Sequence, residues 1–352
     1  MRKKLLKIAL TLLAGYLLLE AGTYFLMGYV GIIADRPSFN WGRIGVHFYK
    51  DVPTDWAIWH EPNSTFRHLR SCFDIEYRFN SEGMRDRPRE REGASSRVVV
   101  LGDSFIEGWG AEEEARMTNL LERAKGKEFL NFGCSGSLGP IQYYLVYDRL
   151  AKLFSHDQVL VGILPANDFD DDNYELWVDS GRRRPFWVGE GANRELRYTE
   201  AKPRNGWGPR LHRFLKEYSY FYNAFESLKQ RWKWRQRNVQ AGIHSRFYDF
   251  SEEEMERMLF SLQKLREASR GKKLTLMLIP LYPDANRYAQ EGKSPLTKRL
   301  EAWAAGQDVV VIDLLPWFQQ RGTKVKAYSH RCDNHWNARG HQAAFELIEK
   351  YF

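Results

Sequence analysis

The chain has 352 residues, enough for one large α/β domain with insertions or for two smaller domains. Apolar residues make up 43% of the chain and aromatic residues 14%, so it is expected to fold around a sizeable core. Its net charge of +8 suits nucleic acid, an anionic membrane surface or an acidic polymer as a partner. No zinc-finger, RNA-recognition or helix-turn-helix pattern accompanies this charge, which argues against a nucleic-acid-binding protein.

Residues 1–34 are predicted to be a membrane anchor. An apolar run from Ile8 to Ala34 is long enough to cross a bilayer core of about 30 Å, and it follows four basic residues, Arg2, Lys3, Lys4 and Lys7. Basic residues favour the cytoplasmic side, so we expect a single-pass protein with a cytoplasmic N-terminus and its body outside the cytoplasm, as in a bacterial inner membrane protein facing the periplasm. The alternative is a cleaved signal peptide with Ile8 to Leu19 as its apolar region, although no small-x-small cleavage site follows.

Glu20 interrupts this apolar run. One carboxylate near the middle of a membrane costs about 2 to 3 kcal/mol on insertion scales, which the surrounding leucines outweigh. The residue is therefore either a tolerated polar residue or one that pairs with another helix or a partner.

Residues 35–96 are predicted to link the anchor to the body and to contribute edge strands. The stretch SCFDIEYRFNSEGMRD has the pattern of a strand followed by a turn at Asn80 to Gly83. The three cysteines of the chain, Cys72, Cys134 and Cys332, fit no metal-binding spacing. In an oxidising compartment they allow at most one internal disulfide, and the sequence leaves the pair open.

From Arg97 onward, predicted strands and helices alternate. The strands are five apolar runs at 97–101, 128–132, 158–164, 273–280 and 308–313. The helices are expected at about 111–125, 140–153, 251–271, 296–305 and 338–352. This alternation predicts an α/β fold for residues 97–352, with a parallel sheet covered on both faces as a three-layer α/β/α sandwich.

Residues from about 174 to 245 interrupt this rhythm as an insertion rich in tryptophan and arginine. Apolar residues at helical spacing predict a helix that packs its apolar stripe on the body; they are Leu211, Phe214, Leu215, Tyr218, Tyr222, Phe225 and Leu228. The insertion also carries Trp177, Trp187, Trp207, Trp232 and Trp234. These rings either pack inward, stack on sugars, help grip an anionic polymer or lie at the bilayer interface.

Four predicted loops hold polar residues that suit catalysis. They contain Gly102-Asp103-Ser104, Asn131 to Gly136, Asn167-Asp168, and Asp333 to Trp336. The first three follow successive strands, and the fourth precedes the last helix. Because loops at the carboxyl ends of parallel strands converge on one edge of the sheet, we expect these residues to form a single site.

The residue types in these loops predict nucleophilic catalysis by a serine. Ser104 needs a base to remove its proton, and His335 is the natural base, with Asp333 as its orienting partner. Residues two apart share a side only in an extended segment, so Asp333 can orient His335 only if both lie outside a helix. Asn337 is expected to cap the last helix, which leaves Asp333 to His335 in the preceding loop. The backbone N–H groups of Ser104 and Gly136 are candidate oxyanion donors, and a side chain at position 136 would crowd the substrate. The side-chain amide of Asn167 is the third candidate donor.

With these four blocks the chain resembles the SGNH hydrolases, also called the GDSL-like esterase/lipase superfamily, over residues 97–172 and from 273 to the end. The resemblance implies a flavodoxin-like sandwich, Ser104 as nucleophile, His335 as base, and an oxyanion hole of Ser104, Gly136 and Asn167. Two blocks depart from the common pattern: Pro165-Ala166 precedes Asn167 where the family often has glycine, and Asp333-Asn334-His335 is one residue shorter than the usual D-x-x-H. The shorter form followed by Trp336 is similar to that of membrane-associated polysaccharide O-acetyltransferases and esterases.

The expected function is therefore ester hydrolysis or acyl transfer on acyl groups, mainly O-acetyl, of a cell-envelope glycan. A lipase or thioesterase for longer acyl chains and a non-catalytic, membrane-anchored glycan-binding scaffold are the alternatives. The mechanism calls for no metal and no organic cofactor. The expected partners are an acyl-ester substrate and the membrane, with no nucleic acid, and the sequence identifies no protein partner.

Overall fold

The computed structural model describes residues 2–30, 34–37, 39, 50–52, 56–93, 96–202, 206–240, 242 and 244–352. Parts of the predicted anchor, linker and insertion, namely residues 31–33, 40–49, 53–55 and 203–205, lie outside the described residues. The centre of the fold is a five-stranded parallel sheet with the strand order β11-β10-β7-β5-β6. Its strands are β5 (Arg97–Gly102), β6 (Glu128–Gly133), β7 (Gln158–Ile163), β10 (Lys273–Leu278) and β11 (Val309–Asp313).

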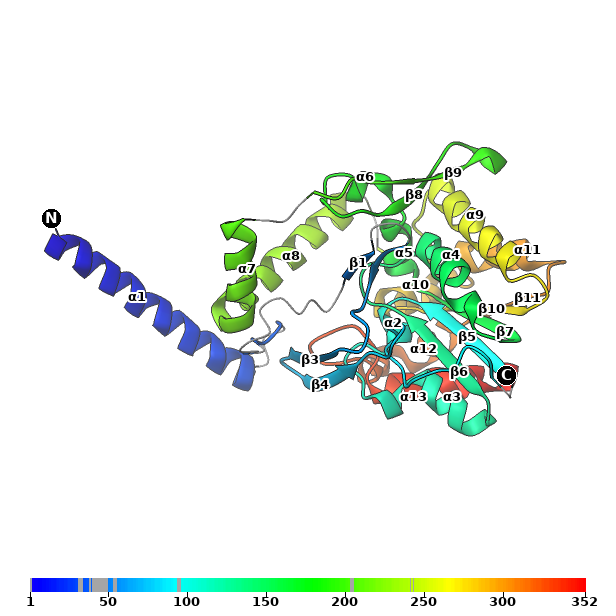
Figure 1. Cartoon of the computed structure of the whole chain (residues 1–352), viewed down its shortest axis with the longest axis horizontal. Helices are drawn as coiled ribbons and strands as arrows, with labels where there is room; N and C mark the ends of the chain where they lie inside the picture. The colour runs from blue at the N-terminus through cyan, green and yellow to red at the C-terminus, as the bar shows by residue number, and fades with distance from the viewer. Residues whose placement is uncertain are drawn as a thin grey trace.

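Helices cover both faces of this sheet (Figure 1). One face carries α3 (Met117–Lys125), α12 (Leu315–Arg321) and α13 (Ala338–Ile348), and the other carries α4 (Pro140–Arg149), α9 (Glu252–Ala268) and α11 (Pro295–Ala304). The inner strand β5, between β7 and β6, is buried along its whole length, as an apolar strand between two helix layers must be. The predicted three-layer α/β/α sandwich is confirmed.

The order of the strands opens a crevice at one edge of the sheet. The chain starts in the sheet with β5, adds β6 on one side, and then crosses to β7 on the other side of β5. When the connections from two neighbouring strands run in opposite directions, a crevice forms at the carboxyl ends of these strands. Ligands bind in this crevice in open α/β sheets. The loops after β5 and β7 contain Ser104 and Asn167.

Most helix ends follow the predicted capping signals. Ser251 and Glu254 form the capping box that begins α9, and Gly126 ends α3 in the left-handed conformation. The helix predicted at 111–125 begins only at Met117, because Gly108 and Gly110 turn the chain after the short helix α2 (Ser104–Glu107). The helices α5 (Pro165–Asp171) and α10 (Tyr282–Glu291) also flank the carboxyl edge of the sheet.

The segment before the sandwich forms two small antiparallel sheets. One joins β1 (Lys50–Val52) to β2 (Ala57–Trp59), and the other joins β3 (Thr65–Arg70) to β4 (Phe73–Arg78). The second hairpin is attached to the loop before α13 by a disulfide between Cys72 and Cys332, whereas Cys134 is a buried free thiol. The structure therefore selects the pair that the sequence leaves open.

The insertion contains a short helix, a hairpin and two longer helices. Its elements are α6 (Tyr174–Trp177), β8 (Pro185–Val188), β9 (Glu195–Tyr198), α7 (Trp207–Tyr218) and α8 (Tyr220–Gln240). The expectation of one helix with its apolar stripe packed on the body is wrong. The chain breaks at Ser219, and Leu211, Phe214, Phe225 and Leu228 are exposed.

The N-terminal helix α1 (Arg2–Phe25) continues into a π-helical turn at Leu26–Val30. Among the described residues, this is the one helix that is long and apolar enough to cross a membrane, and a signal sequence would have the same properties. Figure 1 shows α1 projecting away from the sandwich, with α7 and α8 beside its C-terminal part.

Candidate active site

The structure brings Ser104, His335 and Asp333 into one hydrogen-bonded sequence. Ser104 Oγ lies 2.7 Å from His335 Nε2. His335 Nδ1 is hydrogen-bonded to Asp333 Oδ1, which also accepts the backbone N–H of His335 at 3.1 Å. Asn337 caps α13 by accepting the N–H groups of Arg339 and Gly340, so the helix begins after the loop that holds Asp333 and His335. This is the arrangement that activates a serine hydroxyl.

A sharp turn at the end of β5 presents Ser104. Gly102 has φ +156°, and a Cβ there would lie 2.3 Å from Ile106 Cγ1, so no other residue fits. Asp103 caps α2 by accepting the N–H of Phe105 at 2.9 Å. Ser104 is thus the first residue of α2, and its N–H belongs to the first turn, whose N–H groups have no partner within the helix.

The second oxygen of Asp333 binds two residues that the sequence did not single out. Arg70, at the end of β3, lies 2.7 Å from Asp333 Oδ2, and the indole N–H of Trp109 donates to the same oxygen at 3.1 Å. Burial would raise the pKa of Asp333, but His335 and then Arg70 hold it well below its ordinary value. Asp333 therefore stays ionised, and both of its oxygens are held in place.

Arg70 and Trp109 reach Asp333 by different routes. Trp109 follows Ser104 by five residues, within the same VVVLGDSFIEGWG stretch. Its position near the candidate site could therefore have been considered from the sequence. Arg70 lies far from Asp333 in the chain, and the only clue is that its neighbour Cys72 pairs with Cys332. That clue appears only once the disulfide is known.

Replacing Cys72 and Cys332 with serine is expected to lower the stability by about 2 to 5 kcal/mol, because the cross-link constrains the unfolded chain. Ester turnover should also fall, since the disulfide holds the strand of Arg70 against the loop of Asp333. Thermal unfolding and p-nitrophenyl acetate turnover of the double variant measure both effects. Cys134→Ala is the matched control, because it removes a thiol without removing a cross-link. An unchanged melting temperature in the double variant would contradict the prediction.

The three predicted oxyanion donors line one cavity of about 440 Å³ together with Ser104 Oγ and His335. The walls also include Trp109, Leu164, Leu281 and Trp234. The cavity therefore combines convergent polar groups with apolar walls, as small-molecule sites usually do.

The side chain of Asn167 is held by two carboxylates. Its amide nitrogen donates to Asp171 Oδ2 at 2.8 Å and to Asp103 Oδ2 at 3.4 Å. The second contact is at the outer limit of a hydrogen bond. Donation to a substrate oxygen therefore requires that the amide give up this longer contact.

The structure shows a further reason for glycine at position 136. A Cβ at this position would lie 2.9 Å from Ile58 Cγ2 on β2, so a side chain would collide with the protein. The preceding Ser135 donates its N–H to the buried carboxylate of Glu107, and Glu107 lies 3.5 Å from His60 Nε2. Burial would raise the pKa of Glu107, but His60 holds it below its ordinary value. Glu107 thus fixes the Gly136 loop, a role that no local pattern indicates.

Four buried aspartates lie beneath the cavity, in the loop after β5 and on and just after α5. Burial raises the pKa of Asp103 and Asp171 to about 6, that of Asp172 to about 8, and that of Asp168 well above its ordinary value. Asp168 accepts hydrogen bonds from the Tyr143 hydroxyl at 2.8 Å and the Leu164 N–H at 2.9 Å. Asp168 therefore holds the start of α5 in place.

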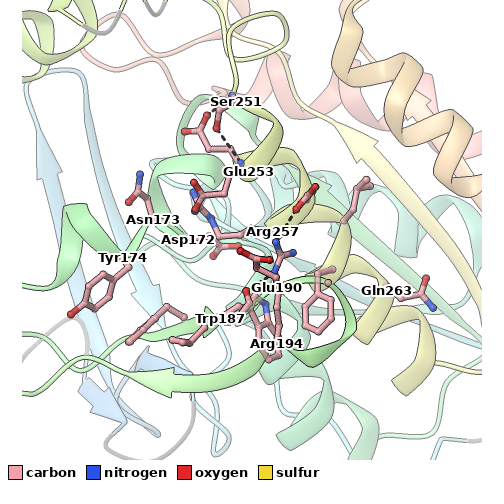
Figure 2. A pocket seen from close by; sticks show the side chains of 18 of the residues that line it. Asp172, Asn173, Tyr174, Trp187, Glu190, Arg194, Ser251, Glu253, Arg257 and Gln263 are labelled. Carbon is pink, nitrogen blue, oxygen red and sulfur yellow. Dashed lines mark hydrogen bonds and ion pairs between the residues drawn. The ribbon is translucent and has the colours of Figure 1, made fainter.

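A larger groove of about 1610 Å³ lies beside this site, between the β8–β9 hairpin and α9 (Figure 2). Tyr174, Trp187, Arg194, Arg257 and Gln263 are among the residues that line it. Asp171 lines the Ser104 cavity and its neighbour Asp172 lines the groove, so both adjoin the end of α5. The β8–β9 hairpin of the insertion thus forms one wall of a groove next to the site.

The comparison with solved structures gives distant matches. A lipolytic protein of the G-D-S-L family from Veillonella parvula DSM 2008 is 13% identical, with a TM-score of 0.40 and coverage of 73% of this chain and 98% of that chain. The lipase/acylhydrolase from Enterococcus faecalis is 11% identical, with a TM-score of 0.40 and coverage of 73% and 95%. A carbohydrate esterase family 2 enzyme with a carbohydrate-binding domain from Corynascus thermopiles (Myceliophthora fergusii) is 14% identical, with a TM-score of 0.39 and coverage of 75% and 67%.

A search of curated proteins finds no match. A family model, by contrast, matches residues 100–343, which is more than half of the chain and includes all four loops of the site. Its description is the GDSL-like lipase/acylhydrolase family. The chain therefore belongs to the GDSL-like lipase/acylhydrolase family of SGNH hydrolases.

Proposed function

We propose that this protein is a membrane-anchored serine esterase or acyltransferase that acts on acyl groups, chiefly O-acetyl, of a cell-envelope glycan. The observation that carries the proposal is the 2.7 Å hydrogen bond from Ser104 Oγ to His335 Nε2, with Asp333 on the opposite nitrogen of the ring. Ser104 and His335 line a cavity large enough for an acyl ester.

In the first half of the proposed reaction, Ser104 Oγ attacks the ester carbonyl carbon while its proton passes to His335 Nε2. Asp333 holds the tautomer that leaves Nε2 free to accept this proton and stabilises the imidazolium that results. The backbone N–H groups of Ser104 and Gly136 and the amide of Asn167 bind the oxyanion of the tetrahedral intermediate. The intermediate collapses to an acyl-serine as His335 protonates the departing alcohol.

In the second half, water or a glycan hydroxyl attacks the acyl-serine after giving its proton to His335. Water completes hydrolysis, whereas a hydroxyl completes transfer of the acyl group. Ser104 recovers its proton from His335 as the second intermediate collapses, so the residues end as they began. The chain's own residues perform every step.

The groove beside the site favours a substrate larger than a simple acyl ester. It is lined by aromatic rings, arginines, carboxylates and amides, which are the groups that bind sugar rings and hydroxyls. It begins at Asp172, directly after the Asp171 that lines the Ser104 cavity. A glycan in the groove would place an acylated hydroxyl of a neighbouring sugar near Ser104.

Contacts of α1 favour an uncleaved anchor over a signal peptide. The carboxylate of Glu20 accepts the Ser219 hydroxyl and, at 2.8 Å, the N–H of Tyr220 at the start of α8. Met27 is buried against Ala34 and Ala224. Glu20 thus pairs with another helix, which the sequence left open as one of two interpretations. A segment removed during export has no need of such contacts.

The proposal predicts that O-acetyl esters are better substrates than longer acyl esters. We expect kcat/KM to fall by about tenfold or more from p-nitrophenyl acetate to octanoate, since each poorly accommodated methylene group costs up to about 1 to 3 kcal/mol of transition-state binding. We also expect acetate to be released from an O-acetylated glycan. Tyr174→Ala should raise KM for the glycan while leaving p-nitrophenyl acetate turnover unchanged, because Tyr174 lines the groove and not the Ser104 cavity.

Two results would contradict this assignment. Turnover that rises from acetyl to octanoyl esters would favour a lipase or thioesterase, which the apolar walls of Trp234, Leu164 and Leu281 could accommodate. Glycan binding without turnover of any ester, by a folded protein, would favour the scaffold.

A further inference from the structure

An apolar face runs along both long helices of the insertion. On α7 it consists of Leu211 and Phe214, and on α8 of Phe225, Leu228, Trp232 and Val239; these six residues, here called the docking face, are 44% to 62% exposed. Within each helix their spacing of three, four or seven places them on one side. A surface helix of a soluble domain would turn such a stripe toward the core, whereas the described part of the chain leaves these six side chains exposed.

The same two helices are strongly basic. Residues 207–240 contain eight lysines and arginines and two glutamates. Helices that combine an apolar stripe rich in Phe, Leu and Trp with a Lys/Arg-rich polar face lie in the headgroup region of membranes, where the cations meet lipid phosphates. The charge thus favours an anionic lipid surface over an apolar protein surface.

The contacts of α1 indicate how deep α7 and α8 lie in the membrane. From Lys7 to Glu20 an α-helix rises about 20 Å, against a hydrocarbon core of about 30 Å. With Lys7 at the cytoplasmic interface, Glu20 lies in the outer leaflet. Glu20 binds Ser219 and Tyr220, the residues that join α7 to α8, and the rings of Tyr24 and Tyr220 are 5.2 Å apart. The junction of the two helices is therefore held at the level of the outer leaflet.

The direction of α8 matches the plane of a membrane. In Figure 1, α8 runs crosswise to α1, and the sandwich lies beyond the C-terminal end of α1. A helix that crosses a spanning helix at the outer leaflet lies along the surface of the bilayer. The docking face is thus continuous with the segment proposed to span the membrane.

We propose that the docking face of α7 and α8 inserts into the outer leaflet of the phospholipid bilayer that α1 spans, as a second membrane contact. This inference rests on the proposed anchor. Insertion of the docking face would also fix the position of the candidate active site relative to the membrane. Trp234 of α8 lines the Ser104 cavity, and Arg237 of α8 pairs with Asp170 of α5. The mouth of the cavity is thereby held at the membrane surface, where acyl esters attached to or close to lipids are presented.

Depth-dependent quenching of a single fluorophore tests the inference in the full chain. The native cysteines do not interfere, since Cys72 and Cys332 form a disulfide and Cys134 is buried. An environment-sensitive thiol dye is attached to Phe225→Cys or Leu211→Cys, with Leu12→Cys in α1 as the positive control and the exposed Ala124→Cys on α3 as the negative control. Each protein is reconstituted in vesicles of phosphatidylcholine and phosphatidylglycerol, with or without spin-labelled acyl chains.

We expect the dyes at positions 225 and 211 to shift to the blue and to lose most of their emission to the spin-labelled lipid, as at position 12 but not at position 124. Water-like, unquenched emission at 225 and 211 with quenching at 12 would overturn the inference. A blue shift without quenching would also overturn it, because a protein surface such as a second copy would then cover the face. An unquenched dye at position 12 would remove the anchor and the inference together. Turnover of p-nitrophenyl acetate in the same samples reports separately on the fold and on the proposed esterase.

Discussion

Ser104→Ala is expected to lower kcat/KM for p-nitrophenyl acetate by at least about 10⁴-fold, the loss typical when a serine nucleophile is removed. Ser104 Oγ lies 2.7 Å from His335 Nε2, so alanine removes the hydroxyl that this base would deprotonate. The variant should keep its fold, since alanine at the first position of α2 leaves the cap from Asp103 intact. Labelling by a fluorophosphonate probe should disappear together with turnover.

His335→Ala serves as the comparison for this variant. If the two side chains act as one unit, the double variant should lose little more kcat/KM than either single variant does. Ser104→Ala with unchanged turnover and a melting temperature equal to that of the parent would remove the enzymatic interpretation. Additive losses would show that the two residues act separately.

Asp333→Asn is expected to lower kcat by about 10³ to 10⁴-fold with a small change in KM, because an amide no longer fixes the productive tautomer of His335. It also leaves the guanidinium of Arg70 facing a neutral group where it now has a carboxylate at 2.7 Å. Steady-state kinetics on p-nitrophenyl acetate separate the effect on kcat from that on KM.

Arg70→Gln provides a graded control for this prediction. Asp333 would keep its bonds to His335 and Trp109, so a loss nearer tenfold is expected from weaker orientation alone. Equal losses in Asp333→Asn and Arg70→Gln would contradict a specific role for Asp333 and indicate that both act through the structure of the loop. A loss mainly in KM would contradict it as well.

The loops of the candidate active site could be located from the sequence because each signal is local. The strand at Arg97 ends in Gly102, which has an unusual backbone angle, and Ser104 follows two residues later. The capping box at Ser251 and the cap at Asn337 also depend on residues within one turn. The start of α3 differs from the prediction, because two glycines that turn the chain outweigh the helical pattern before Met117.

The sequence by itself determined the order of strands and helices, the parallel sandwich that follows from it, and the identity of the residues at the carboxyl edge of the sheet. The hydrophobic period, the helix caps and the ends of strands depend on neighbours along the chain, so the sequence alone predicts them. Only the tertiary structure decided which cysteines pair, which groups orient Asp333, and where the apolar stripe of α7 and α8 points. These features depend on contacts between distant segments, such as Cys72 and Cys332, which are 260 residues apart. The sequence pattern of a helix predicts that its apolar face has a partner, but it does not identify that partner.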